Sequence, residues 1–416
     1  MPKLSLNASK NTKHTPAGEI PVDWGCVKFG EAISSTQLGG NYAGELADSG
    51  TPLMKMGNML RGKFDVTRFE RIPDSQVNEC DILHKEDLLL NTRNSLDLVG
   101  KVSMWRNELE RAVFNSNMMR LSPNQKFIQS NAFLNYVLNS EYCLKEIAQR
   151  ATGTTSVAAI YWRDLATMRL PLPPCHEQCK IADILSTWDE TLETLDALIA
   201  AKDHQKQALM QQLLTGKTRV KGAKGKWISA KLGDLFDERV ERDRIDLPLL
   251  SITADRGVVP RDELAKRDTS SEDKSKYLRI APGDIGYNTM RMWQGVSALS
   301  TLEGIVSPAY TICRPTTRID GMFAAHFFKF PHTIHLFHRW SQGLVDDTLN
   351  LKFPSFSVIE VFIPESITEQ QQIAAILETA DQELTLLRTQ RQTLDQQKRG
   401  LMQRLLTGKI RVNAPT

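Results

Sequence analysis

Two long segments of the chain repeat apolar residues at alternating steps of four and three. The first series runs from Ile181 to Leu213 and the second from Ile373 to Leu405. A sustained period of 3.5 residues is typical of helices that pair along one seam in a coiled coil. The pattern therefore predicts two long helices with these apolar coiled-coil residues: Ile181, Leu185, Trp188, Leu192, Leu195, Ile199, Leu209, Leu213, Ile373, Leu377, Leu384, Leu387, Leu394, Leu401 and Leu405.

The two helical segments are copies of one another. Residues 177–220 and 369–412 align at a constant offset of 192, and 23 of the 44 aligned positions are identical. Both copies close on Leu-Leu-Thr-Gly-Lys-x-Arg-Val. A weaker repeat precedes each copy, because the residues from Trp24 to Glu31 resemble those from Trp227 to Asp234. The chain is therefore expected to consist of two half-units, each a variable domain followed by a near-constant helix.

The variable domains have short apolar runs separated by turn signals, which is typical of mixed, strand-rich domains. Residues 132–147 and 322–340 are predicted to be helical. If the long helices run antiparallel, the second variable domain joins neighbouring helix ends, whereas a parallel pair would require it to span the whole length. The predicted fold class is α+β, with two mixed α/β domains separated by an antiparallel coiled coil of two long helices and a pseudo-two-fold internal repeat.

These patterns divide the chain into seven expected segments. Residues 217–231 carry six basic residues and no acidic one, so the connection between the halves is a basic linker. The segments are an N-terminal tail (1–19), a first variable domain (20–172), helix 1 (173–216), the basic linker (217–226), a second variable domain (227–365), helix 2 (366–408) and a C-terminal tail (409–416).

The composition is that of an ordinary globular protein. The 416 residues include 52 Lys+Arg and 49 Asp+Glu, so a net charge of +3 does not by itself indicate nucleic-acid binding. We expect no membrane span and no signal peptide, because the chain has no long apolar run and its first residues are polar. The six cysteines are interpreted as reduced thiols of a cytoplasmic protein.

Motifs that would indicate catalysis or metal binding are weak. Residues 214–218 resemble the end of a phosphate-binding loop, but Gln211 stands where that motif requires Gly. Residues 175–179 offer Cys, His and Cys without a second cluster nearby, and the three His of residues 332–338 fit an amphipathic helix better than a metal site. We expect no catalytic centre, no metal and no cofactor bound by this chain.

The duplicated architecture resembles the specificity subunits of type I restriction-modification systems. The resemblance rests on the Glu-Gln-x-x-Ile-x-x-Ile-Leu and Leu-Leu-Thr-Gly-Lys-x-Arg-Val motifs of residues 170–220 and 361–412, and is weak inside the variable domains. It implies a non-catalytic subunit in which each variable domain is a target recognition domain for one half of a split, asymmetric site in double-stranded DNA. The coiled coil would set the gap between the half-sites.

The resemblance also implies partners. Two methyltransferase subunits would bring S-adenosylmethionine and methylate adenine at N6, and motor-nuclease restriction subunits would bring the sites for ATP and Mg. Two alternatives remain open: a DNA-reading module from another restriction-methylase arrangement, and a structural scaffold whose domains bind protein.

Candidate contact residues follow from the chemistry of base and phosphate recognition. The loops after two repeated apolar strands and a small Gly-containing loop carry suitable side chains, although Asn in such a loop also caps its own backbone in a structural turn. The candidate DNA contacts are Lys55, Arg61, Asn91, Thr92, Arg93, Asn94, Ser95, Thr152, Thr154, Thr155, Ser156, Arg256, Asn288, Thr289, Arg291, Trp293 and Gln294. The candidate subunit-interface residues are Gln205, Gln211, Gln212, Gln397, Gln403 and Arg404.

Overall fold

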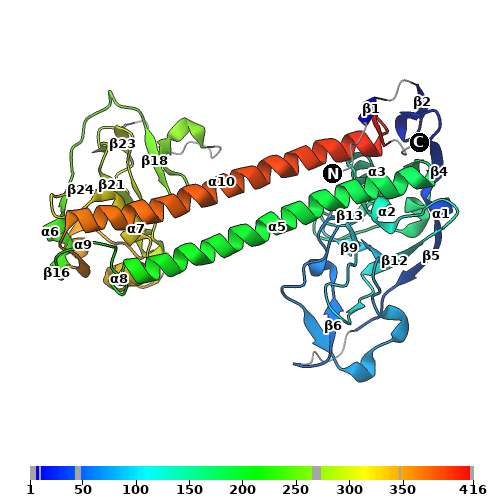
Figure 1. Ribbon diagram of the computed structural model, residues 1–416, viewed down its shortest axis with the longest axis horizontal. Coiled ribbons are helices and arrows are strands. Elements are labelled where there is room, and N and C mark those ends of the chain that lie inside the picture. The colour runs from blue at the N-terminus through cyan, green and yellow to red at the C-terminus, as the bar shows by residue number, and fades with distance from the viewer. Residues whose placement is uncertain (1–5, 9–10, 43–47, 265–272, 346–347, 413–416) are drawn as a thin grey trace. The chain divides into compact units, whose positions relative to one another are not determined.

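The protein is described by a computed structural model that covers residues 6–8, 11–42, 48–264, 273–345 and 348–412. The chain divides into two compact units. Unit 1 consists of residues 1–195 and 390–416, and unit 2 consists of residues 196–389. Each unit combines one variable domain with a part of each long helix (Figure 1).

Unit 1 is built from short strands and helices packed on the first part of α5 and the last part of α10. Its main sheet has four antiparallel strands in the order β10-β8-β12-β5. The elements are β1 (Leu6–Ala8), β2 (Thr12–Thr15), β3 (Gly18–Pro21), β4 (Gly25–Lys28), α1 (Phe29–Ala32), β5 (Ile33–Leu38), β6 (Thr51–Met54), β7 (Glu70–Ile72), β8 (Leu88–Asn91), β9 (Arg93–Asn94), β10 (Val102–Met104), β11 (Val113–Phe114), β12 (Met118–Pro123), α2 (Asn131–Leu138), α3 (Glu141–Arg150), β13 (Thr152–Gly153), β14 (Ala158–Ala159), α4 (Trp162–Leu165), β15 (Arg169–Leu172), α5 (Cys175–Leu213) and β26 (Ile410–Val412).

Unit 2 repeats this order with shorter loops. Its main sheet has the order β22-β21-β24-β17, which matches that of unit 1 strand for strand. The elements are β16 (Trp227–Lys231), α6 (Leu232–Leu235), β17 (Phe236–Glu238), β18 (Leu250–Thr253), β19 (Gly257–Pro260), β20 (Leu278–Ile280), β21 (Ile285–Asn288), β22 (Ser297–Leu299), β23 (Gly304–Val306), β24 (Tyr310–Pro315), α7 (Gly321–Phe328), α8 (Pro331–Trp340), α9 (Phe353–Ser357), β25 (Glu360–Pro364) and α10 (Ile367–Leu406).

The two shorter helices predicted in the variable domains are each divided in the structure. Residues 132–147 fall in α2 and α3, and residues 322–340 fall in α7 and α8. The hydroxyl of Ser140 accepts the backbone N–H of Cys143 and so starts α3 afresh. Pro331 occupies the first turn of α8, where its missing N–H costs nothing. A continuous apolar pattern concealed both breaks.

The long helices α5 and α10 end at Leu213 and Leu406, shortly before the predicted limits at 216 and 408. α5 is followed by Gly216 and α10 by Gly408, and both glycines have left-handed backbone angles, with φ of +72° and +68°. This conformation terminates helices at low cost only when the residue lacks a Cβ. Gly400 lies inside α10 without interrupting it.

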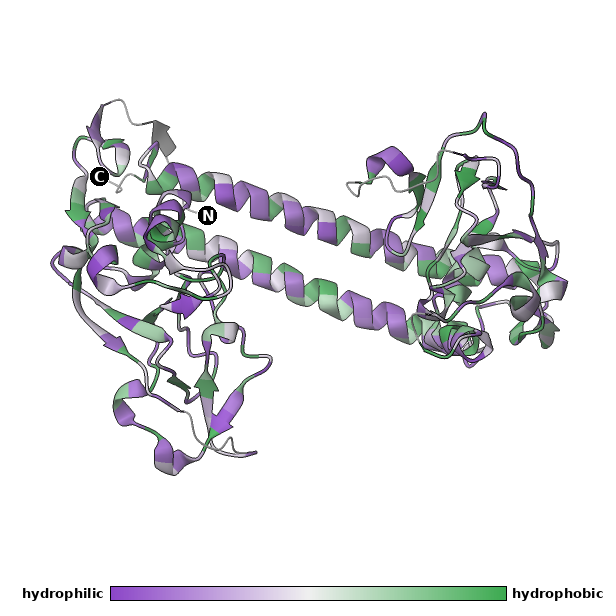
Figure 2. Cartoon of the chain, turned by 180° about the vertical axis from the view of Figure 1, so that it is seen from behind, coloured by the Kyte–Doolittle hydropathy of each residue, from purple (hydrophilic) through white to green (hydrophobic). Residues whose placement is uncertain are grey.

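The predicted coiled-coil positions are all buried or half-buried, and none is exposed. The positions near the helix ends join the largest apolar core of each unit, in which α5 and α10 contribute Leu185 and Leu405 in unit 1 and Leu213 and Leu377 in unit 2. Hydrophobic and hydrophilic bands alternate along both helices in Figure 2. Burial of one stripe on each helix provides most of the stability of such amphipathic elements.

Ion pairs between the helices give their relative direction within each unit. In unit 1, Lys398 contacts Asp189 at 2.5 Å, and residue 411 contacts residue 177 further along. In unit 2, Arg388 contacts Asp203 at 3.1 Å, and residue 381 contacts residue 206. In both units, residues with higher numbers in α5 pair with residues with lower numbers in or just after α10. The helix segments are therefore antiparallel in each unit.

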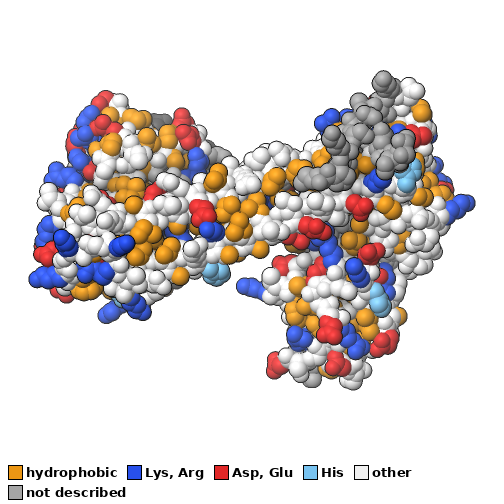
Figure 3. Space-filling model, viewed as in Figure 1, with side chains coloured by type: hydrophobic (Ala, Val, Ile, Leu, Met, Phe, Trp, Pro, Cys, Tyr) orange, Lys and Arg blue, Asp and Glu red, His pale blue; other side chains and the backbone are white. Residues whose placement is uncertain are grey.

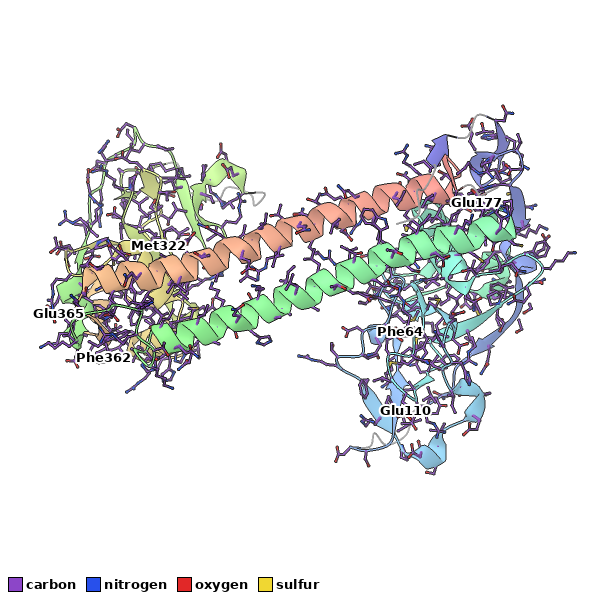
Figure 4. The ribbon with its side chains drawn as sticks, in the orientation of Figure 1. Phe64, Glu110, Glu177, Met322, Phe362 and Glu365 are labelled. Atoms are coloured by element: carbon purple, nitrogen blue, oxygen red, sulfur yellow. The ribbon has the colours of Figure 1, made fainter. Side chains whose placement is uncertain are left out.

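A buried carboxylate begins each long helix and accepts hydrogen bonds from a Trp and an Arg. In unit 1, Glu177 is 1% exposed and accepts Trp24 Nε1 at 2.9 Å, Arg411 Nε at 3.0 Å and Arg411 Nη2 at 2.9 Å. These bonds raise the pKa of Arg411. Figure 4 labels Glu177 near the start of α5.

Unit 2 repeats this arrangement. Glu369 is equally buried and accepts Arg219 Nη2 at 2.6 Å and Trp227 Nε1 at 3.4 Å. The Arg-Val that closes each constant segment therefore binds the Glu that opens the other one.

The Gln after each Glu attaches the variable domain to the helix. Gln178 donates to the carbonyl oxygen of Phe127 at 2.8 Å and accepts the backbone N–H of Gln129 at 3.1 Å. Gln370 donates to the carbonyl oxygen of Arg318 at 3.1 Å and accepts the backbone N–H of Asp320 at 2.7 Å. Both Gln side chains are completely buried, so these bonds replace the water that the amides would otherwise bind.

The terminal segments were predicted as tails, and their described parts form strands instead. β1 pairs with β26 in the register Leu6 to Val412, and β2 pairs with β3 as a hairpin. Residues 1–5, 9–10 and 413–416 of the predicted tails lie outside the described residues. The lysines of the basic linker at 217, 221, 224 and 226 are exposed, in agreement with a solvated connection.

Candidate functional site

The loop after β8 is shaped by its own Asn and Thr. Asn91 is fully buried, and its Oδ1 accepts the backbone N–H of Arg93 at 3.1 Å. Thr92 is 9% exposed, and its hydroxyl donates to the carbonyl oxygen of Asn117 at 3.0 Å. The predicted contact of the Asn91 and Thr92 side chains with DNA is not supported by this placement. Their hydrogen bonds fit the structural turn that the sequence left as the alternative.

The loop after β21 has the same hydrogen bonds. Asn288 Oδ1 accepts the backbone N–H of Met290 at 3.0 Å, and the Thr289 hydroxyl donates to the carbonyl oxygen of Ala309 at 2.7 Å. Both side chains are half-buried. The repeated Asn-Thr pair therefore fixes the direction in which each loop leaves its strand, and the residues that follow it carry the exposed chemistry.

In unit 1 the structure brings two predicted loops together. Arg93 and Asn94 in β9 pair with Ala159 and Ala158 in β14, and β14 pairs in turn with β13. The backbone N–H of Leu96 also donates to the carbonyl oxygen of Thr155 at 3.1 Å. The loops 91–95 and 152–156, which are separated by more than fifty residues, therefore form one small antiparallel sheet.

One face of this small sheet points to solvent. Ala158 and Ile160 are buried, whereas Val157 and Tyr161 are 72% and 50% exposed, as expected when side chains alternate along a strand. Arg93 lies opposite Ala159 and is exposed. We call the exposed residues of this sheet the outer face; they are Arg93, Thr152, Thr154, Thr155, Ser156, Val157 and Tyr161.

The sequence analysis missed Tyr161 and the residue beside it. The guanidinium of Arg163 lies 5.7 Å from the centroid of the Tyr161 ring, and its side chain is 83% exposed. An exposed aromatic ring next to an Arg is a combination that stacks on nucleic-acid bases and binds phosphate. The adjacent Tyr-Trp-Arg at 161–163 was the available signal in the sequence.

The remaining polar residues of these loops are arranged by local hydrogen bonds. Asn94 Oδ1 accepts the backbone N–H of Ser95 at 2.8 Å, and both residues are half-buried. The hydroxyl of Thr154 accepts the backbone N–H of Val157 at 3.3 Å and lies 3.4 Å from that of Ser156. These bonds close the hairpin and leave the hydroxyls of its tip accessible.

Unit 2 has a corresponding surface with different side chains. The backbone N–H of Leu351 donates to the carbonyl oxygen of Thr289 at 2.8 Å, as Ile160 does to Thr92 in unit 1 at 2.9 Å. Lys352 therefore holds the position that corresponds to Tyr161, and it is exposed.

The predicted residues of the unit 2 loop divide into a fixed and an exposed group. Trp293 is half-buried, donates Nε1 to the carbonyl oxygen of Met290 at 3.0 Å and lies edge-on to His338. Arg291 and Gln294 are exposed. The Trp supports the loop, and the Arg and the Gln are the groups available for recognition.

Three predicted cations differ in their surroundings. Lys55 forms an ion pair with Glu70, and Arg256 forms one with Glu263 at 3.0 Å. Partial burial lowers the pKa of Arg61. Partial burial also lowers the pKa of Lys101, and the nearby positive charge of Arg61 lowers it further. Lys55 and Arg256 already face a carboxylate and Arg61 is exposed, so Arg61 is the strongest phosphate candidate of the three.

The predicted subunit-interface residues lie on the exposed sides of the long helices. All six are exposed, and Gln403 Nε2 donates to Glu141 Oε2 at 3.4 Å.

Positive and negative side chains are interspersed over the visible face of both units in Figure 3. In the described residues, no cluster of three or more His, Cys, Asp or Glu could hold a metal ion, and no helix is long and apolar enough to cross a membrane.

Comparisons with known proteins point to one family. Residues 44–201 match the family model of the type I restriction modification DNA specificity domain. The chain is 24% identical over 443 residues to the putative type I restriction enzyme MjaX specificity subunit of Methanocaldococcus jannaschii, covering 98% of this chain and 99% of that protein. It is 28% identical over 218 residues to the MjaVIII specificity subunit of the same organism, covering 51% of this chain and 50% of that one.

A solved structure has the same fold over the whole chain. The S subunit of a type I restriction-modification system from M. genitalium superposes with a TM-score of 0.58 at 16% identity, covering 99% of this chain and all of that one.

Proposed function

We infer that this chain is a specificity subunit of a type I restriction-modification system and reads double-stranded DNA with two target recognition domains of different specificity. It is a DNA-recognition subunit without catalytic activity of its own. We place the recognition surfaces on the outer face of unit 1 and on the corresponding surface of unit 2. Each would contact one half of a bipartite, asymmetric site.

The outer face carries this proposal. It joins loops from distant parts of the sequence into a single exposed surface with a cation, a row of hydroxyls and an aromatic ring. Arg93 can donate two hydrogen bonds to guanine or to phosphate, and the hydroxyls can donate to or accept from any base edge. The counterpart in unit 2 offers Arg291, Gln294 and Lys352. The two surfaces share a backbone and differ in side chains, which is the property required of two readers with unlike targets.

The charge of the variable domains supports a need for partners. Residues 25–170 contain 17 basic and 16 acidic residues, giving +1, and residues 227–365 contain 17 basic and 19 acidic residues, giving −2. Neutralisation of phosphates supplies most of the nonspecific affinity for DNA. We therefore propose that two methyltransferase subunits complete a positive channel around the DNA. They would dock on the exposed Gln205, Gln211, Gln212, Gln397, Gln403 and Arg404.

The remaining roles follow from this assignment. The two long helices would form an antiparallel coiled coil that holds the recognition domains at a fixed spacing and so sets the gap between the half-sites. S-adenosylmethionine would bind the methyltransferase subunits, and ATP and Mg would bind the motor-nuclease subunits that join for restriction. Work on host DNA would place the complex in the cytoplasm.

Methylation mapping of host DNA tests the assignment of the surfaces. The wild-type complex, co-expressed with its methyltransferase subunit, should methylate adenines in one bipartite motif. Arg93→Ala should relax or abolish recognition in one half-site, because a bidentate Arg–guanine contact discriminates by roughly 1–3 kcal/mol. Arg291→Ala should affect only the other half-site.

The exposed Arg399 on α10, whose side chain is 77% exposed, provides the matched control, because its replacement by Ala removes the same charge outside both surfaces. An unchanged motif in both surface variants would refute the proposal.

A further inference from the structure

Unit 2 contains an apolar groove at the end of α5. Its volume is about 410 Å³, and it lies between the two residues that follow that helix, the α7–α8 corner and the edge of β25. Phe362, labelled in Figure 4, is 54% exposed at this groove although it is a large aromatic residue. The lining residues that the argument uses are Thr215, Ser229, His332, Leu336, Glu360 and Phe362.

The repeat identifies the same place in unit 1. β4 pairs with β15 as β16 pairs with β25, with Lys28 opposite Arg169 and Lys231 opposite Glu360. Counting along these strands, Pro171 is the counterpart of Phe362.

Two more lining residues have counterparts. The residue after the first position of α3 is Tyr142, and that of α8 is His332. The Thr of the Thr-Gly-Lys motif is Thr407 in unit 1 and Thr215 in unit 2.

In unit 1 this place is covered by the β2–β3 hairpin. Pro21 lies against Gly408, since a Cβ added to that glycine would come within 2.4 Å of the proline ring. At the other end of the hairpin, the hydroxyl of Tyr142 donates to the carbonyl oxygen of Pro16 at 3.3 Å. Ile20 between them is 1% exposed and belongs to the core of the unit, and Pro171 beneath is buried.

Unit 2 has no such cover among its described residues. The linker before β16 reads Lys-Gly-Ala-Lys-Gly-Lys over residues 221–226 and offers no counterpart of Ile20 and Pro21. A Cβ added to Gly216 would first meet the side chain of Trp227, whereas a Cβ added to its counterpart Gly408 would first meet Pro21. The lining residue Glu360 lies opposite Lys231 in the β16–β25 pair.

We propose that the groove of unit 2 binds an extended segment of a partner protein that resembles the chain's own Gly-Glu-Ile-Pro-Val-Asp at residues 18–23. An Ile side chain fills the groove, the following Pro packs on the rings of Trp227 and Phe362, whose centroids are 5.5 Å apart, and neighbouring acidic residues face Lys217 and Lys231. Burial of these apolar surfaces drives the association. Because the hairpin already fills the counterpart, the segment binds once per chain.

A peptide with the sequence of residues 14–23 is the probe. It carries a fluorophore and is titrated into the full-length chain, and its anisotropy reports binding. We expect saturable binding at one site per chain. Phe362→Glu and Leu336→Asp, on opposite walls of the groove, should each weaken binding more than tenfold, and the peptide with Ile20→Asp should not bind. Ile245→Glu is the matched control, because Ile245 is 71% exposed elsewhere in unit 2.

The outcomes are separable from those of the DNA proposal. Phe362→Glu should leave the methylated motif unchanged, since the groove is distinct from the surface around Arg291 and Lys352. A peptide that fails to bind, or that binds equally to Phe362→Glu, overturns the proposal. The proposal is also overturned if the wild-type chain has the mass of a dimer in solution and Phe362→Glu dissociates that dimer. The groove would then hold a second copy of the chain.

Discussion

Replacement of Arg411 by Gln tests the buried ion pair with Glu177 at the start of α5. The substitution keeps a long polar side chain and removes the charge that faces Glu177. Glu177 is buried and would lose two charge-assisted hydrogen bonds, retaining the neutral donors Trp24 Nε1 at 2.9 Å and the Val412 N–H at 3.2 Å. A carboxylate in this state is partly satisfied but unpaired.

The expected cost can be estimated from the surroundings. Breaking a buried ion pair by removing one partner costs about 3–5 kcal/mol. The Arg411 side chain is 22% exposed, so water relieves part of the penalty, and the two neutral donors remain. We therefore expect about 3 kcal/mol, at the lower end of that range. The second ion pair of Arg411, with the half-exposed Asp23, adds less than about 1 kcal/mol.

Hydrogen exchange on the full-length chain measures this cost locally. Amides of β26 and of the first turns of α5 should exchange with an opening free energy lowered by about 3 kcal/mol, which corresponds to a rise in exchange rate of roughly two orders of magnitude. Amides of unit 2 should be unaffected. Arg399→Gln is the control, because its ion pair with Asp395 is exposed and worth less than about 0.5 kcal/mol.

The double variant separates charge burial from lost packing. Glu177→Gln combined with Arg411→Gln leaves no buried unpaired charge and should recover part of the stability lost in Arg411→Gln. If Arg411→Gln and Arg399→Gln changed exchange equally, the inferred role of the buried pair would be refuted. Arg219→Gln should act in the same direction on unit 2, with a smaller effect because its side chain is more exposed than that of Arg411.

Three further predictions concern stability. Gly400→Ala should raise the free energy of unfolding by up to about 1 kcal/mol, because the residue lies inside α10 with open space around its Cα. Gly408→Ala should lower the free energy of unfolding, because this residue has a positive φ and contacts Pro21. Thermal melts of both variants check these expectations. Burial lowers the pKa of His326, which faces Asp381, Glu378, Lys206 and Lys329. The free energy of unfolding should therefore be highest above the pKa of an unfolded His, about 6.5, and should decrease as the pH falls through that value. Denaturant titrations at several pH values should show this dependence in the wild type and in His335→Gln but not in His326→Gln. Tyr136→Phe should destabilise unit 1 by about 1 kcal/mol by removing its 2.6 Å bond to Asp189, as measured by urea unfolding.

The repeated helices could be predicted because their signal is redundant. A 3.5-residue period, two nearly identical copies and terminal glycines all point to the same helix limits, and the buried seam from Ile181 to Leu213 follows from them. The breaks at Ser140 and Pro331 could not be derived from periodicity, because the apolar pattern continues through them. The strand role of residues 410–412 was also hidden, since its partner lies at the other end of the chain.

The candidate site was predicted by residue type and less well by position. Polar residues after a strand were singled out as candidate DNA contacts, but the alternatives for Asn91 differ only in where the side chain points. The shape of the loop after β8 depends on the hairpin of residues 152–159, which pairs with β9 and which no local pattern connects to it. The same pairing exposes Tyr161, so its importance became visible only when the two loops were placed together.

The constant segments owe their constancy to two contacts that the variable domains must satisfy. Asp189 pairs with Lys398 in unit 1, and Asp381 pairs with Lys206 in unit 2, at positions related by the offset of 192. Each Asp also meets side chains from its variable domain: the Tyr136 hydroxyl and Arg106 in unit 1, and His326 in unit 2. The helices thus present the same carboxylate to both domains, and each domain places different polar side chains beside it. A domain can therefore change its reading surface freely while it keeps one polar group toward the Asp and one pair of backbone groups toward the buried Gln.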